Sequence, residues 1–74
     1  MNDRASASIF VMANQGMIKG WSRPEPLRLD VTPLRPMARH NAIRLLEAQG
    51  YRAELWWSPR RSSWTIRVHI TPGK

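Results

Sequence analysis

The sequence predicts a small α+β domain in which one helix packs on one face of an antiparallel or mixed sheet of three to five strands. Residues 51–70 alternate apolar and polar side chains on both sides of the turn Ser58-Pro59-Arg60-Arg61-Ser62-Ser63, which is typical of a β-hairpin. Residues 36–49 instead place apolar side chains at three- and four-residue spacings, which indicates a helix. The predicted order is hairpin, strand, helix, hairpin.

The length of 74 residues leaves room for one domain. So short a chain buries only about 60% of its unfolded surface when it folds. We expect the compact domain over residues 9–72, after a polar and flexible N-terminus over residues 1–8. The chain has no cysteine, so neither a disulfide nor a thiolate zinc site can hold it together. Bulky apolar side chains, among them four Trp, must supply the core.

Residues 9–21 are compatible with two structures. The run Ile9-Phe10-Val11 is of β type, while Gly16 and Gly20 would each cost a helix about 1 kcal/mol. A hairpin that turns at residues 14–16 is therefore favoured over a weak helix across residues 7–19.

The next two elements have clearer patterns. Residues 27–31 alternate Leu and Val with Arg28 and Asp30, which predicts a half-buried strand. Pro36 suits the first position of the following helix, and Gly50 suits the left-handed position just past its end. We expect the apolar stripe of this helix to lie on the C-terminal hairpin.

The C-terminal hairpin has a predictable register. Centring the turn on Arg60 and Arg61 places four apolar pairs on one face: Trp57 with Trp64, Leu55 with Ile66, Ala53 with Val68 and Tyr51 with Ile70. The other face sets Glu54 against Arg67, which predicts a cross-strand ion pair, and also carries Trp56. We therefore expect the first face, with Trp57 and Trp64, to form the core.

Positive charge is concentrated in the second half of the chain. The formal net charge is +7, and residues 35–74 carry eight of the twelve basic residues but only two of the five acidic ones. Such asymmetry indicates a polyanionic partner, which can be nucleic acid, an anionic membrane or an acidic protein surface. An Arg-rich surface that serves solubility alone is the alternative.

Two groups of residues are candidates for binding this partner. The first is the outer face and tip of the hairpin, with Trp56, Arg60, Arg61, Arg67, Arg52 and His69. An exposed indole offers a stacking platform for bases, and guanidinium groups contact phosphates. The second is a basic group on the helix: Arg35, Arg39, His40 and Arg44. For the hairpin group, a solvated surface without a partner is as simple an explanation as binding. For the helical group, a solvated surface is the simpler explanation.

Other classes of function find little support. The five carboxylates are scattered, no nucleophile lies beside a base, and there is no glycine-rich phosphate loop. We therefore expect neither catalysis nor a cofactor or metal ion. No run approaches the ~20 apolar residues of a membrane span. We expect a cytoplasmic protein, and a homodimer is compatible with the sequence.

These observations favour a small, non-catalytic nucleic-acid-binding protein with a regulatory or accessory role, which uses the basic, Trp-containing C-terminal hairpin. The alternative is a protein-interaction module or inhibitor, of the kind that phages and plasmids encode, which docks on an acidic surface of a larger nucleic-acid-processing complex of the host. The sequence does not distinguish DNA from RNA or protein as the partner.

Overall fold

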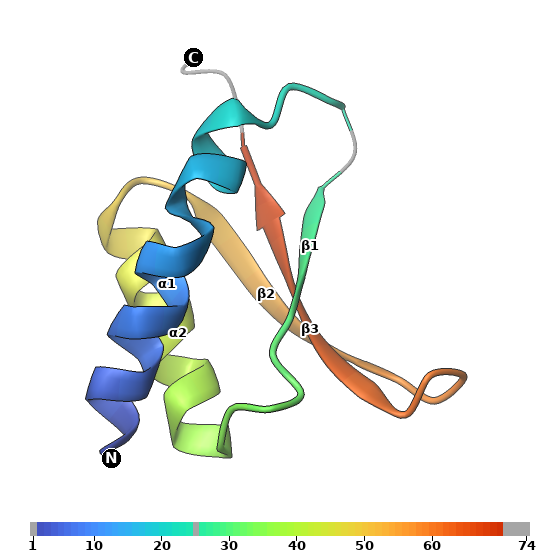
Figure 1. Cartoon of the computed structure of the whole chain (residues 1–74). Helices are drawn as coiled ribbons and strands as arrows, with labels where there is room; N and C mark the ends of the chain where they lie inside the picture. Colours follow the sequence, from blue (N-terminus) through green and yellow to red (C-terminus); the bar gives the residue numbers. More distant parts are fainter. Residues whose placement is uncertain (1, 25, 71–74) are drawn as a thin grey trace.

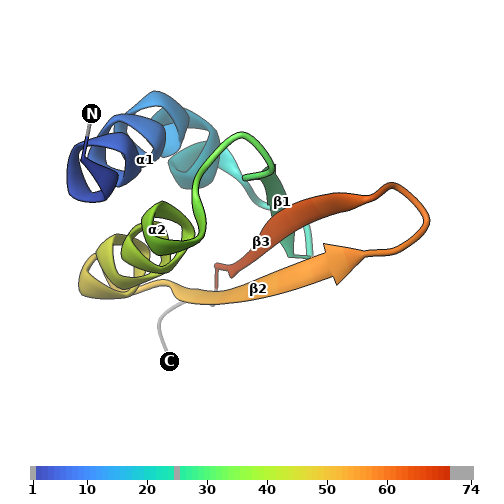
Figure 2. The same ribbon diagram turned by 90° about the horizontal axis from the view of Figure 1, so that it is seen from below.

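The computed structural model describes residues 2–24 and 26–70 and has an α+β architecture with two layers. The elements, in chain order, are helix α1 (Asp3–Gly20), strand β1 (Leu27–Asp30), helix α2 (Pro36–Ala48), strand β2 (Arg52–Ser58) and strand β3 (Ser63–His69). Both helices lie on the same side of the sheet (Figures 1 and 2). The predicted end of the domain, residues 71–72, lies outside the described residues.

The first predicted hairpin is wrong, because residues 3–20 form one helix. Its start is well specified: the Asn2 side chain accepts a hydrogen bond from the Ala5 backbone N–H at 2.7 Å, and Asp3 is an acidic residue in the first turn. Residues 3–8, expected to be flexible, form the first turns of this helix. Tertiary packing decides the outcome, since the buried residues Ala7, Val11 and Ile18 share one face of the helix.

Helix α2 follows the prediction closely. It begins at Pro36 and ends at Ala48, and its buried residues are Ala38, Ala42 and Leu46. Beyond its end, Gly50 has a φ of 94°, a left-handed conformation that glycine adopts without steric cost. The expectation of a single helix on the sheet is corrected, because α1 packs beside α2 and completes the helical layer.

The sheet has three antiparallel strands in the order β1-β3-β2. The predicted register of the hairpin is confirmed, with Trp57 opposite Trp64, Leu55 opposite Ile66 and Ala53 opposite Val68. The fourth predicted pair, Tyr51 with Ile70, lies just outside the two strands. Strand β1 pairs with the free edge of β3, so that Arg28 lies opposite Arg67.

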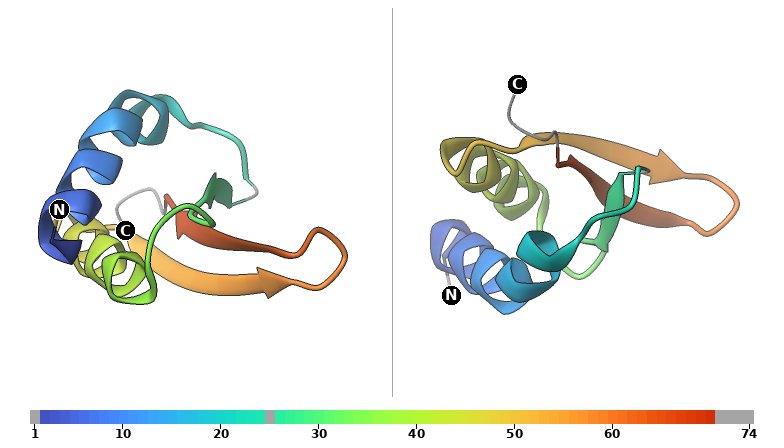
Figure 3. Two further views of the ribbon diagram at one scale, coloured as in Figure 1. Left: turned by 60° about the horizontal axis from the view of Figure 1, so that its bottom comes forward. Right: turned by 90° about the horizontal axis from the view of Figure 1, so that it is seen from above.

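The core lies between the inner face of the sheet and the two helices. Its most deeply buried large side chains are Ile18, Leu46, Ile66, Val31 and Val68. The far end of the hairpin projects beyond the helices, as Figure 3 shows.

The two tryptophans of the inner face are therefore not equally covered, and the prediction that both belong to the core is corrected. Trp57 remains 44% exposed, whereas Trp64 is half-buried against the core. The two rings contact each other with their centroids 5.2 Å apart and their planes tilted by 52°. The pair thus marks the point at which the helical cover ends.

Candidate functional site

Alternate residues of the three strands lie on the face of the sheet opposite the helices. We call this surface the outer sheet face; its members are Arg28 and Asp30 from β1, Thr65, Arg67 and His69 from β3, and Arg52, Glu54 and Trp56 from β2. None of the described helices covers it (Figure 2). The exposed side chains of this face are Arg28, Asp30, Arg52 and Trp56, while its other members are partly buried.

Trp56 is the only large aromatic side chain of the outer sheet face and is held in a defined orientation. The Arg67 guanidinium lies over its ring, 3.8 Å from the centroid. Its indole N–H donates a hydrogen bond to Glu54 Oε1 at 3.0 Å. The residue nevertheless remains 45% exposed, so the indole is both fixed and accessible.

Glu54 organises one end of this face. Its carboxylate lies 3.8 Å from the Arg52 guanidinium and 3.7 Å from His69 Nε2. The predicted ion pair with Arg67 does not form, although the register is correct, because Arg67 lies over Trp56 instead. The pKa of Glu54 is lowered, first by the hydrogen bond from Trp56 and then by His69 and Arg52, against the opposing effect of burial. The carboxylate is thus stabilised in its charged form.

A hollow of about 430 Å³ lies between Trp56 and the turn of the hairpin. Its lining residues come from all three strands and the turn: Arg28, Trp56, Trp57, Ser58, Pro59, Arg60, Arg61, Thr65 and Arg67. Within the described part of the chain, no carboxylate lies within 4.0 Å of a guanidinium nitrogen of these four arginines. The hollow therefore concentrates positive charge beside an exposed indole.

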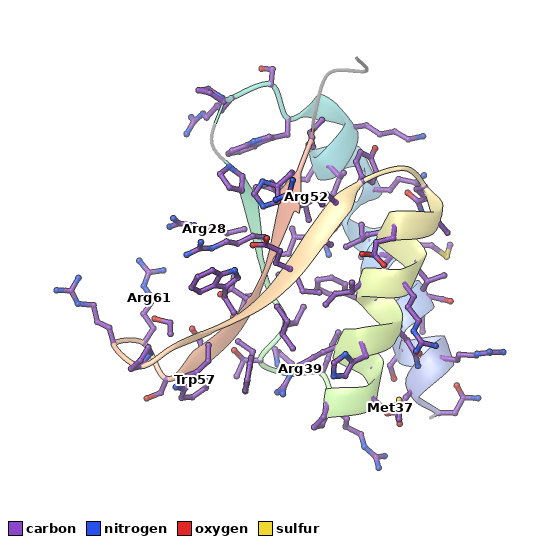
Figure 4. All side chains as sticks on the ribbon, turned by 180° about the vertical axis from the view of Figure 1, so that it is seen from behind. Arg28, Met37, Arg39, Arg52, Trp57 and Arg61 are labelled. Atoms are coloured by element: carbon purple, nitrogen blue, oxygen red, sulfur yellow. The ribbon has the colours of Figure 1, made fainter. Side chains whose placement is uncertain are left out.

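Two arginines of this hollow, Arg28 and Arg67, are direct cross-strand neighbours. Like charges in this position destabilise a sheet, and a bound anion would relieve the repulsion. Figure 4 shows Arg28 and Arg61 on the side of the sheet away from the helices, while Met37 lies on α2. Arg28 was not among the predicted site residues: the strand pattern of residues 27–31 implied its outward position, but not that β1 would pair with β3.

The structure separates the predicted helical group from the outer sheet face. Arg39 binds the end of β1 from the inner side: its Nε donates to the Val31 carbonyl at 3.0 Å, and its Nη2 donates to the Thr32 carbonyl at 3.1 Å. Its guanidinium also lies 5.2 Å from the centroid of the Trp64 ring. These contacts give Arg39 a structural role.

The other members of the helical group face different surroundings. Arg44 lines a separate hollow of about 470 Å³, which Arg4 and Asn41 also line. Arg35 lies 3.7 Å from Asp3 at the start of α1. Trp56, Arg60, Arg61, Arg67, Arg52 and His69 thus lie on the outer sheet face or at its tip, whereas Arg39 and Arg44 do not join them.

A hydrogen-bonded turn fixes the strand from which Arg28 projects. The Thr32 hydroxyl donates to Asp30 Oδ1 at 2.6 Å and accepts from the Trp64 backbone N–H at 2.9 Å. The Thr32 backbone N–H donates to the same carboxylate oxygen at 2.9 Å. Both bonds from Thr32 lower the pKa of Asp30. The end of β1 is thereby tied to β3, and Arg28 is held beside Arg67.

Comparison of the chain with family models, with curated proteins and with solved structures gave no match. No helix among residues 2–24 and 26–70 is long and apolar enough to cross a membrane. The same described residues contain no group of three or more His, Asp or Glu side chains that could hold a metal ion.

Proposed function

We propose that the protein is a small, non-catalytic nucleic-acid-binding protein with a regulatory or accessory role, and that the outer sheet face is its binding surface. The observation that carries this proposal is the hollow that Arg28, Arg60, Arg61 and Arg67 line together with the exposed Trp56. One guanidinium group can donate two parallel hydrogen bonds to the oxygens of a phosphate, and an aromatic ring beside it can contact a base. The hollow combines both types of group.

The charge distribution supports phosphate as the ligand of the arginines. Four guanidinium groups line one hollow, and none has a carboxylate partner among the described residues. Their mutual repulsion is a cost in the free protein, and a phosphate backbone would remove it while its condensed counterions are released. The binding energy should therefore fall steeply as salt is added.

The test compares two double variants that each remove two positive charges. Arg60→Ala with Arg61→Ala should weaken binding to all sequences similarly and lower the slope of log K against log salt by up to about 2. The control, Arg4→Ala with Lys19→Ala, removes two charges from exposed positions of α1 and should leave the slope nearly unchanged. Fluorescence anisotropy at several salt concentrations measures both.

Adding Arg28→Ala to the tip variant should lower the slope further, because Arg28 lines the same hollow. Equal slopes for the tip variant and the α1 control would remove the hollow from the binding site.

A second candidate function is docking on an acidic surface of a larger protein complex, as an interaction module or inhibitor. It is favoured by Trp57, which is 44% exposed on the opposite face of the hairpin from Trp56, so that the projecting end presents an indole on each side. Exposed Trp beside Arg is typical of protein-protein hot spots. Capture of a single partner from lysate that survives nuclease treatment would favour this function over nucleic-acid binding.

A further inference from the structure

We propose that the nucleic acid bound by the outer sheet face is single-stranded and that one of its unpaired bases stacks on Trp56. This inference rests on the proposed function and deepens it, since phosphate contacts alone do not distinguish one strand from two.

The indole of Trp56 has no free hydrogen-bonding group. Tryptophan has one polar group, the Nε1–H, and that group donates to Glu54 Oε1 at 3.0 Å. Trp56 therefore cannot read the edge of a base pair in a groove. It can contribute only through the apolar surface of its ring.

The ring is held in place with one face against Arg67, so an incoming base would stack on its other face. Glu54 fixes its N–H edge and Arg67 lies over it at 3.8 Å, yet 45% of the residue remains exposed. An indole held in this way loses little further side-chain entropy when a flat ligand binds. Bases in a duplex already stack on each other, so only an unpaired base can offer its face to Trp56.

The charges across the sheet fit one phosphate backbone better than two. Arg28, Arg67 and Glu54 lie opposite one another on the adjacent strands β1, β3 and β2 of the sheet. Two strand spacings therefore separate the Cα atoms of Arg28 and Glu54, a distance of about 10 Å. A single strand can follow the side with Arg28 and the hairpin tip. A duplex presents its second backbone across a groove about 12 Å wide, and there it would meet the Glu54 carboxylate, which offsets the charge of Arg52.

The test uses three labelled probes: a single-stranded oligonucleotide, its duplex, and the same single strand with abasic sites in place of its bases. The abasic strand is a matched probe, because it keeps every phosphate and removes only the bases. Wild-type protein should bind the complete strand about 5- to 150-fold more tightly than the abasic strand, which corresponds to stacking worth ~1–3 kcal/mol. It should also bind the complete strand more tightly than the duplex.

Two variants assign this difference to Trp56. Trp56→Ala should bind the complete and abasic strands with nearly equal affinity, while its affinity for the abasic strand matches that of the wild type. Trp56→Phe should keep most of the wild-type preference, because stacking accepts any planar ring. Thermal melts of both variants report whether the fold is retained, which we expect because Trp56 lies outside the core.

The outcomes separate this inference from the proposed function. Salt-sensitive binding of all three probes with equal affinity would leave the proposed function standing and overturn the single-strand inference. Tighter binding to the duplex, or an unchanged preference for the complete strand in Trp56→Ala, would overturn it as well. Failure to bind any probe would overturn both.

Discussion

The β2–β3 hairpin places apolar side chains on its inner face along its whole length, but its two ends have different surroundings. Near the helices, the inner face carries Ala53, Ile66 and Val68, which are 8%, 0% and 0% exposed. At the projecting end, which Figure 3 shows, the same face carries Trp57, and this residue is 44% exposed. Strand alternation therefore specifies the face on which a side chain lies, and the helices decide how deeply it is buried.

This difference divides the hairpin into two parts with distinct roles. The part under the helices contributes to the hydrophobic core and to stability. The projecting part is free of that requirement, and it carries Trp56, Arg60 and Arg61 beside the hollow of the outer sheet face. A substitution should consequently affect folding in the first part and binding in the second.

The largest expected effect tests this division directly. Ile66→Ala should lower the free energy of unfolding by about 2–5 kcal/mol, because Ile66 is fully buried and its truncation leaves a cavity. Trp57→Ala removes more atoms but should cost only about 1–2 kcal/mol, because nearly half of that residue already contacts water. Urea denaturation of the two variants measures the difference. Equal losses would show that the projecting end belongs to the core.

The next effect tests helix α1, whose packing beside α2 completes the cover over one part of the hairpin. Gly16 lies within this helix, and apart from its chain neighbours and the adjacent helix backbone no atom lies within 4 Å of where a Cβ would be placed. Gly16→Ala should therefore stabilise the protein by up to about 1 kcal/mol. The same change at Gly50, where φ is 94°, should destabilise it by a similar amount. Thermal melts that show Gly16→Ala to be destabilising would contradict the helix.

The smallest effect concerns Glu54, on the outer sheet face. Its pKa in the folded state is lowered below its ordinary value, so its contribution to stability is present above the unfolded-state pKa and is lost as the pH falls through the folded-state pKa. This contribution should be slight, because the group is exposed to solvent screening. The hydrogen bond to Trp56 should weaken over the same acidic range.

Nuclear magnetic resonance can follow that hydrogen bond directly. The indole N–H resonance of Trp56 should move as the pH falls below the ordinary pKa of a glutamate, because protonation weakens Glu54 as an acceptor. The indole of Trp57, for which the described residues supply no carboxylate acceptor, is the internal control. Parallel shifts of the two resonances would indicate a general change in structure rather than titration of Glu54.

The sequence by itself determined the features that depend on neighbouring residues. Pairing about the turn set the register that places Ala53 opposite Val68, and apolar spacing with Pro36 and Gly50 set the bounds of α2 closely. The outward position of Trp56 followed from the same register. In each case, turn chemistry and side-chain periodicity act over a few residues, so a linear pattern records them.

Tertiary structure decided three further features. Residues 3–20 form a helix despite Gly16 and Gly20, because burial of one face against the rest of the chain outweighs a local cost of about 1 kcal/mol for each glycine. Pairing of β1 with β3 brought Arg28 to the candidate site, and the extent of the helical layer left Trp57 exposed. These features depend on contacts between segments far apart in the chain. Their energies are sums over the whole fold, and periodicity within one segment does not contain them.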